Sequence, residues 1–355
     1  MTALRSDIDP DGLLEFSVVF TDRSLNHMSA AFQAVMRDIH AMLCEVYNAD
    51  TAAIVPGGGT YAREAVARQF ATGKKALVLR NGWFSYRWTQ IFEAGAIPSE
   101  EIVMKARRTG NAVDAPFSPA PIEEVVARIR SDRPDVVFAP HVETSSGMIL
   151  PDDYLRAVAD AAHEVGGLFV LDSIASGCAW VDMKSTGVDV LISAPQKGWS
   201  AQPSAGLVMM NEAATARAKA TTSTSFAVDL GKWLSIMEAY LAGGHAYHAT
   251  MPTDALRAFR DTMDETRAYG FEKLRDAQWE QGNRVRALLA DHGLKSGAAE
   301  GFGAPGVVVS YPSDPDVQSG KKFAALGLQI AAGVPLQCDE GPDYRSFRLG
   351  LFGLD

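Results

Sequence analysis

The stretch "VLISAPQKGWSAQPSAGLVMMN", residues 190–211, decides the fold class because it places a lysine between two apolar runs. The runs 189–195 and 205–211 predict buried strands. Lys197 lies in the turn between them, and burial near a dry core penalises a charged ammonium. The amine therefore either reaches solvent along its aliphatic chain or serves as a nucleophile.

Outward from this stretch, short apolar runs alternate with segments of helical periodicity. Helices are predicted at 60–73, directly after a glycine cluster, and at 151–167. The second segment begins with aspartates and ends with glycines, which are typical helix start and stop residues. The alternation predicts an α/β fold with a mostly parallel sheet covered by helices. The predicted strands are 51–55, 74–81, 134–141, 167–173, 189–195 and 205–211.

The pattern changes near residue 254. Long polar helices are predicted over 257–293, followed by short strands around "GVVVSY" and "SFRLGLFG". We therefore expect a large domain over 15–253 and a smaller α+β domain over 254–355. The segment 1–14 is expected to pack on the small domain or on a partner subunit.

Composition excludes several classes of function. The formal net charge is −10 and lysine and arginine are scattered, so there is no basic stripe for nucleic acid. No apolar run approaches membrane-spanning length, and the first residues do not resemble a signal peptide. The three cysteines are widely spaced, which favours a reducing, cytoplasmic setting over a disulfide framework. His245 and His248 lack a local thiolate or carboxylate partner, so no metal site is expected.

Three features together suggest a cofactor site. "VPGGGTYAREAVA" places Gly58, Gly59 and Thr60 between a strand and a helix, where backbone amides and the helix N-terminus suit a phosphate. A tight turn without a ligand is the alternative. Asp172 ends a predicted strand, where α/β sheets place ligand contacts, although a helix cap is also possible. Lys197 follows one strand later. A phosphate cradle, a partner for a pyridine nitrogen and an amine form the set that a pyridoxal phosphate enzyme requires.

Seven motifs in order carry a family resemblance over nearly the whole chain. The sequence resembles the class V aminotransferases of fold type I, and is similar to alanine–glyoxylate and serine–pyruvate aminotransferases. The motifs are "PGGGTYAREAVA", "RNGWFSYR", "APHVETSSGMILP", "LDSIAS", "SAPQKGW", "YHATMP" and "FRLGLFG".

The resemblance implies a role for each matching residue around pyridoxal 5'-phosphate. Lys197 would form the internal aldimine, and Asp172 would pair with the pyridine nitrogen. The phosphate would be held at Gly58, Gly59 and Thr60 with help from Gln196.

Further positions follow from the same resemblance. Phe84 falls where an aromatic ring stacks on the cofactor, with Trp83 as its neighbour and plain core packing as the alternative. Thr144 matches the small hydroxyl residue near the ring oxygen. For the adjacent Glu143 and His141, a structural role and a chemical one both stay open.

The last two motifs concern assembly and substrate. Tyr247 and Thr250 match residues that reach the phosphate of the neighbouring subunit, which implies a homodimer with shared sites; a local turn is the alternative. Arg348 matches the arginine that holds the substrate carboxylate, a task suited to a planar fork. Arg345 is expected on the surface.

The implied activity is transfer of an amino group from a small amino acid to a keto acid such as glyoxylate or pyruvate, in ping-pong fashion. The sequence departs from the family at two places, and the first departure leaves the amino donor open. Residues 26–29 read "NHMS" where the family often has a His-Arg-Ser-Pro run, and the family usually adds a helix after the arginine strand. A lyase, an epimerase or a cysteine desulfurase with Cys338 as its mobile thiol is the alternative within the fold.

Overall fold

The computed structural model describes residues 25–312 and 314–352. Its centre is a seven-stranded sheet in which only β11 runs antiparallel to its neighbours. The mostly parallel α/β fold predicted from the sequence is confirmed. Across the sheet the strands are β1 (Thr51–Pro56), β11 (Ala205–Met210), β10 (Val190–Ser193), β9 (Leu168–Asp172), β6 (Val136–Pro140), β2 (Lys75–Arg80) and β3 (Glu100–Lys105).

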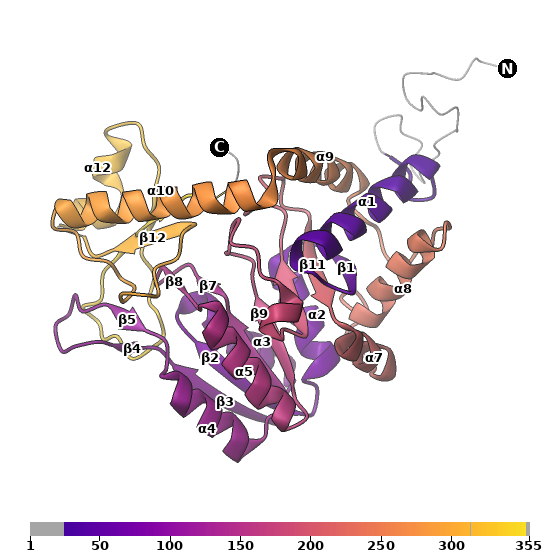
Figure 1. Ribbon diagram of the computed structural model, residues 1–355, viewed down its shortest axis with the longest axis horizontal. Helices are drawn as coiled ribbons and strands as arrows, with labels where there is room; N and C mark the ends of the chain where they lie inside the picture. Colours follow the sequence, from indigo (N-terminus) through magenta and orange to yellow (C-terminus); the bar gives the residue numbers. More distant parts are fainter. Residues whose placement is uncertain (1–24, 313, 353–355) are drawn as a thin grey trace.

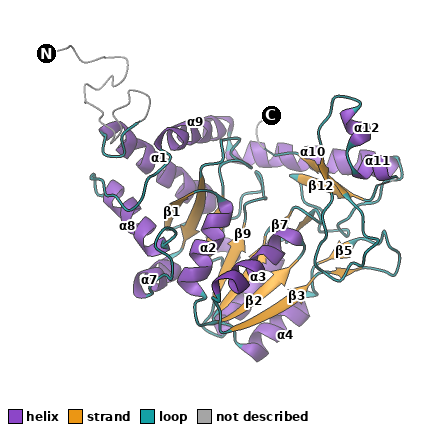
Figure 2. Cartoon of the chain, turned by 180° about the vertical axis from the view of Figure 1, so that it is seen from behind, coloured by secondary structure: helices purple, strands orange, loops and turns teal. Residues whose placement is uncertain are grey.

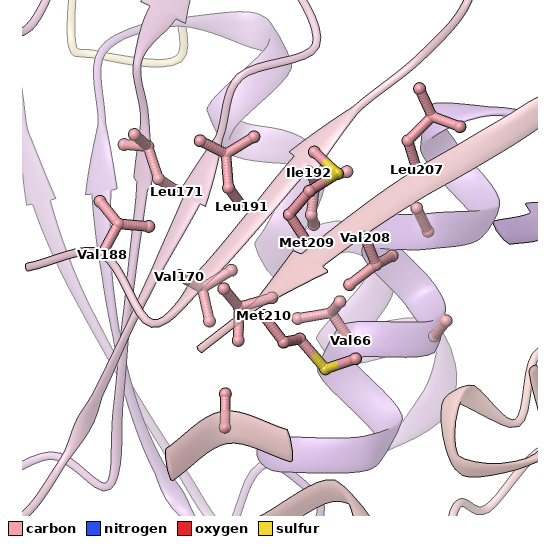
Figure 3. Packing of buried hydrophobic residues seen from close by; sticks show 14 of the residues in the cluster. Val66, Val170, Leu171, Val188, Leu191, Ile192, Leu207, Val208, Met209 and Met210 are labelled. Carbon is pink, nitrogen blue, oxygen red and sulfur yellow. The ribbon is translucent and has the colours of Figure 1, made fainter. Parts of the chain in front are cut away.

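Apolar side chains explain why the predicted strands form. β9 and β10 are buried along their whole length and pair in parallel, with Leu171 opposite Leu191. Their side chains pack with those of β11 and with Val66 (Figure 3). All six predicted strands are present. The sequence analysis missed the edge strand β3, because it begins with two exposed glutamates and lacks the continuous apolar pattern of a central strand.

Helices cover both faces of this sheet. Figures 1 and 2 view the molecule from opposite sides and show α4 and α5 on one face, with α2 and α3 on the other. Helix α1 packs beside α9 (Figure 1). The helices that precede α9 in the described chain are α1 (Ala30–Tyr47), α2 (Gly59–Phe70), α3 (Trp83–Gly95), α4 (Ile122–Asp132), α5 (Asp152–Glu164), α6 (Met183–Thr186), α7 (Glu212–Ala220) and α8 (Leu230–Leu241).

The C-terminal part is built from two long helices and a small sheet. The predicted polar helices are divided at Gly270, whose φ of 105° is a left-handed value that favours glycine. The interruption produces α9 (Thr253–Tyr269) and α10 (Phe271–Asp291). The short helices α11 (Pro315–Gln318) and α12 (Lys321–Ala324) follow. The small sheet has the order β12 (Val307–Ser310), β14 (Phe347–Gly350), β13 (Ala331–Ala332).

Two short hairpins contact the C-terminal part through isolated β-bridges. The pair β4 (Arg107–Arg108) and β5 (Phe117–Ser118) meets the C-terminal part through an isolated bridge between Phe117 and Ala298. The pair β7 (Val142–Glu143) and β8 (Met148–Ile149) follows directly after β6. Among the described residues, no helix is both long and apolar enough to span a bilayer.

The sheet direction places the predicted site residues at one edge. β1, β2, β6, β9 and β10 all run the same way, so the segments that follow them meet at their carboxyl ends. In open α/β sheets this edge is where ligands bind.

Candidate active site

The Lys197 turn is anchored by a buried tryptophan. Trp199 is fully buried and its ring lies 4.9 Å from that of Trp180 and 6.0 Å from that of Phe259, between centroids. Gly198 lies so close to the backbone of Gly177 that an added Cβ would be 2.1 Å from the Gly177 carbonyl oxygen. A larger residue at position 198 would therefore clash with Gly177 and displace the turn that carries Lys197.

Lys197 itself is partly buried and surrounded by cations. Burial lowers the pKa of its amine, and the guanidinium groups of Arg348 and Arg63 lower it further. Its Nζ lies 5.0 Å from the centroid of the Phe352 ring. These surroundings favour a neutral amine, which is the form that attacks a carbonyl or accepts a proton.

Asp172 ends β9 and is almost completely buried. Arg63 of α2 donates to its Oδ2 from Nε at 2.6 Å and from Nη2 at 2.5 Å. The amide of Ile174 donates to Oδ1 at 3.2 Å. The structure thus brings Asp172 to the same edge as Lys197, and it adds a partner that the sequence analysis did not foresee.

The glycine turn opens helix α2. Gly58 is the N-cap and Gly59 the first helical residue, so the free amides of the first turn face outward from the helix end. A Cβ on Gly59 would lie 2.4 Å from Cδ1 of Ile174, whereas one on Gly58 would meet nothing within 4 Å. Gly59 therefore lets the helix approach the loop after Asp172, and the chain around Gly58 and the exposed Thr60 stays open to a ligand.

Phe84 is positioned by Glu143. The carboxylate accepts bonds from the amides of Phe84 at 3.1 Å and Ser85 at 2.8 Å, and from the Ser85 hydroxyl at 2.7 Å. Ser145 donates to the same carboxylate from its hydroxyl at 2.7 Å. Glu143 thus caps α3, which supports the structural reading of this residue. The neighbouring Trp83 donates its amide to Ser145 and contacts Tyr86.

Arg348 lies above the Phe84 ring. Its Cζ is 5.8 Å from the ring centroid, and its Nε donates to the carbonyl of Ala332 at 3.0 Å. β14 points Arg348 toward the site and buries Phe347 on the other side. Arg345 is exposed, as expected, and its Nη1 donates to the nearby carbonyls of Pro342 and Tyr344.

Thr144 and His141 flank Glu143. Thr144 is partly buried, whereas His141 is fully enclosed and its Nδ1 lies 2.7 Å from the Ser176 hydroxyl. Burial lowers the pKa of His141 to about 4. His141 is therefore neutral at pH 7.

Tyr247 and Thr250 lie apart from these groups, on the surface. The Tyr247 side chain is 65% exposed and its hydroxyl lies 3.3 Å from that of Thr250. The ring of His27 packs 5.4 Å from that of Tyr247, between centroids. The segment 26–29, flagged as a departure, therefore adjoins this loop, while residues 1–14 lie outside the described residues.

Two site residues were not predicted, Arg63 on the predicted helix 60–73 and Arg87 on α3, a helix that was not predicted either. Arg63 lies one turn after the glycine cluster, and Arg87 has its Cζ 5.9 Å from the Phe84 ring. An arginine on the otherwise buried face of α2 was the available signal for Arg63, because buried arginines need a partner.

The family model for aminotransferase class V matches residues 15–290. The chain belongs to the class V aminotransferases. Membership makes it a pyridoxal phosphate-dependent aminotransferase, and it confirms the resemblance drawn from the motifs.

Relatives of this aminotransferase act on different amino donors. It is 28% identical to 2-aminoethylphosphonate–pyruvate transaminase of Paraburkholderia phymatum, over 93% of this chain and 86% of that protein. It is 26% identical to alanine–glyoxylate aminotransferase 1 of Saccharomyces cerevisiae, with the same coverage. A solved alanine–glyoxylate aminotransferase from Nostoc sp. superposes with a TM-score of 0.78 at 21% identity, over 93% of this chain and 84% of that one. The last comparison supports the fold alone.

The residues of this aminotransferase fit the cofactor that the family implies. The side-chain Oε1 of Gln196 is buried without a hydrogen-bond partner in the described chain, beside the lysine and within the predicted phosphate set. Buried amide groups are normally satisfied, and the amide can present either oxygen or nitrogen to a ligand. The open space at Gly58 and the Gln196 amide, whose nitrogen would donate to a phosphate oxygen once the amide is turned over, fit a phosphate cradle.

Proposed function

We propose that this aminotransferase moves the amino group of a small amino acid to a keto acid such as glyoxylate or pyruvate, with Lys197 as the residue that bonds the cofactor. The observation that carries the proposal is that Phe84, Asp172 and Lys197 lie at the carboxyl edge of the large sheet, with Arg348 of the small sheet above the Phe84 ring. Pyridoxal phosphate, when bound, would supply an aldehyde that exchanges amines and a ring that accepts electrons.

Each residue has a distinct task in this proposal. Gly58, Gly59, Thr60 and Gln196 hold the phosphate, and Thr144 faces the ring oxygen. Phe84, fixed by the Glu143 cap, offers a flat face for the ring. Asp172 pairs with the ring nitrogen.

Arg348 binds the substrate carboxylate through its guanidinium. Its position over the Phe84 ring directs that carboxylate toward the stacked cofactor. The lowered pKa of Lys197 then suits the amine to carry the proton between the substrate Cα and the cofactor. The ping-pong order follows, since one keto acid must leave before the next enters.

We also propose a homodimer in which Tyr247 and Thr250 reach the phosphate of the partner subunit. Their exposure supports this, together with the 78% exposed Phe226, whose ring packs against His248 on the same loop surface. Tyr247→Phe with Thr250→Val should weaken cofactor binding without changing the mass of the dimer in light scattering. Unchanged cofactor binding would contradict the shared site.

The desulfurase alternative is disfavoured by Cys338. Its thiol is buried and lies 3.3 Å from the carbonyl oxygen of Arg80, and burial raises its pKa to about 12. A buried, protonated thiol is a poor nucleophile.

The donor is tested by exposing the loaded enzyme to alanine, serine and 2-aminoethylphosphonate without a keto acid. An aminoalkylphosphonate is the second candidate, because the guanidinium groups of Arg87 and Arg348 both lie within 6 Å of the centroid of the Phe84 ring, at 5.9 and 5.8 Å. Stable bleaching of the visible band with release of the keto acid or aldehyde supports transfer and identifies the donor. A band that returns after each turnover without an acceptor would contradict it.

The lysine is tested by borohydride reduction followed by peptide mass spectrometry. We expect the cofactor on Lys197, and none on any lysine in Lys197→Ala, whose transfer rate should fall by about 10²- to 10⁴-fold. Lys184→Ala, at an exposed lysine of α6, is the matched control and should behave like the native protein. Trapping on another lysine would overturn the assignment.

A further inference from the structure

Asp172 has an internal cation as its partner. Arg63 and Asp172 are 6% and 3% exposed, and two nitrogens of the Arg63 guanidinium converge on Oδ2 of the carboxylate. A buried charge needs such a partner, and losing one member of a buried pair is costly. The carboxylate that the proposed function pairs with the ring nitrogen therefore already has Arg63 as an ion-pair partner within the protein.

The same close packing that builds the phosphate end of the site places Arg63. Gly59 lets the first turn of α2 contact Ile174, two residues after Asp172. Arg63 follows one turn later on α2 and reaches the carboxylate. Ile174 holds Oδ1 through its amide at 3.2 Å. Helix and loop thus fix the carboxylate from two sides.

The positive charge of Arg63 also affects two groups other than Asp172, the Lys197 amine and the Arg87 guanidinium. It lowers the pKa of Lys197 and of Arg87, in both cases after the effect of burial. Arg63 is therefore close enough to influence the lysine electrostatically. A permanent cation is present where only an acidic partner for the ring nitrogen was expected from the sequence.

We propose that Arg63 is a positioning residue that shares the Asp172 carboxylate with the cofactor's ring nitrogen and so weakens the hold of that nitrogen on its proton. The inference rests on the proposed function. The Arg63 guanidinium holds the Asp172 carboxylate in a fixed orientation, but it also divides the negative charge between two cations. A protonated ring nitrogen beside a fixed guanidinium is less favoured than one beside an unpaired carboxylate.

The test loads the native protein and variants with pyridoxal phosphate labelled with ¹⁵N in the ring, and follows the nitrogen signal by NMR as a function of pH. Arg63→Met removes the charge and keeps much of the length. Arg63→Lys keeps the charge but loses the fork. Arg68→Met is the control, because Arg68 lies on the same helix and pairs instead with Glu64 at 2.8 Å.

We expect Arg63→Met to move the ring-nitrogen signal toward the protonated form and to raise its titration midpoint by about one pH unit or more. Arg63→Lys should fall between Arg63→Met and the native protein, and Arg68→Met should match the native protein. Identical midpoints in the native protein, Arg63→Met and Arg63→Lys would overturn the inference and leave Arg63 a purely structural partner.

The outcomes separate the inference from the proposed function. If the native protein takes up no cofactor, the proposed function fails and this inference fails with it. If it takes up cofactor on Lys197 but the nitrogen signal does not respond at position 63, only the inference fails. Should Arg63→Met not fold by circular dichroism, the comparison of Arg63→Lys with the native protein decides, since loss of the two-nitrogen contact with Asp172 must still shift the midpoint upward.

Discussion

Two buried carboxylates lie at the carboxyl edge of the sheet, and their partners differ in kind. Glu143, just after β6, accepts bonds from backbone amides and serine hydroxyls. Asp172, at the end of β9, is paired with a guanidinium. Neutral donors hold a helix end in place, whereas a charged partner tunes a group that is also available to a ligand. The contrast is between a structural acid, Glu143, and the acid to which the proposed function gives a chemical role, Asp172.

The largest expected effect comes from breaking the charged pair. Asp172→Asn should reduce the transfer rate by about 10²- to 10³-fold, because it removes the carboxylate charge at the reacting ring. It should also cost about 3 kcal/mol of stability, since Arg63 is left buried without its counter-ion. Steady-state kinetics and urea unfolding measure the two effects.

The double variant Arg63→Met with Asp172→Asn sharpens this result. It should recover most of the lost stability but none of the lost rate. A rate restored by the double variant would contradict a chemical role for Asp172.

Removing the neutral-donor carboxylate should affect stability first. Glu143→Ala leaves the first amides of α3 without acceptors, and we expect a loss of about 2–3 kcal/mol in urea unfolding. Glu143→Gln keeps one acceptor oxygen and should cost less than Glu143→Ala. A loss of rate in Glu143→Gln as large as that in Asp172→Asn would erase the distinction between the two acids.

His141 links the two acids, because its amide donates to the carbonyl of Asp172 at 2.9 Å. Its folded pKa of about 4 lies below the ordinary 6.5, so between these values the unfolded chain binds more protons. Stability should therefore fall by up to about 3 kcal/mol as the pH drops from about 6.5 to 4. His141→Asn should flatten that part of a thermal-unfolding profile; an unchanged profile would assign the loss to other groups.

The smallest effect concerns Lys197. Because the folded pKa of Lys197 is lowered, the unfolded chain binds more protons from that pKa up to the ordinary value, and stability rises with pH there. Lys197→Met without cofactor should be slightly more stable than the native chain at pH 7. The difference should shrink as the pH rises toward 10.5, and calorimetry measures it. A constant difference at all pH values would show that packing alone is responsible.

The sequence predicted the central strands well, because residues such as those of β9 and β10 are apolar without interruption. It missed β3, whose edge position tolerates charged residues at its start. Lys197 and Asp172 could be placed at one edge from the strand order alone. The pairing of Asp172 with Arg63, and of Glu143 with Ser85, could not be predicted, because the partners are 109 and 58 residues apart in the sequence. Their contacts depend on how helices approach the sheet.

The aromatic cluster beneath the lysine turn has a consequence for folding kinetics. Trp199 contacts Tyr47 and Trp180 as well as Phe271, which follows the break between α9 and α10. These residues are distant along the chain, and long loops must close before such contacts form. The turn that carries Lys197 should therefore become ordered late in refolding, after the local helices. The rate at which the cofactor becomes bonded to the protein during refolding would then report the rate of the last folding step.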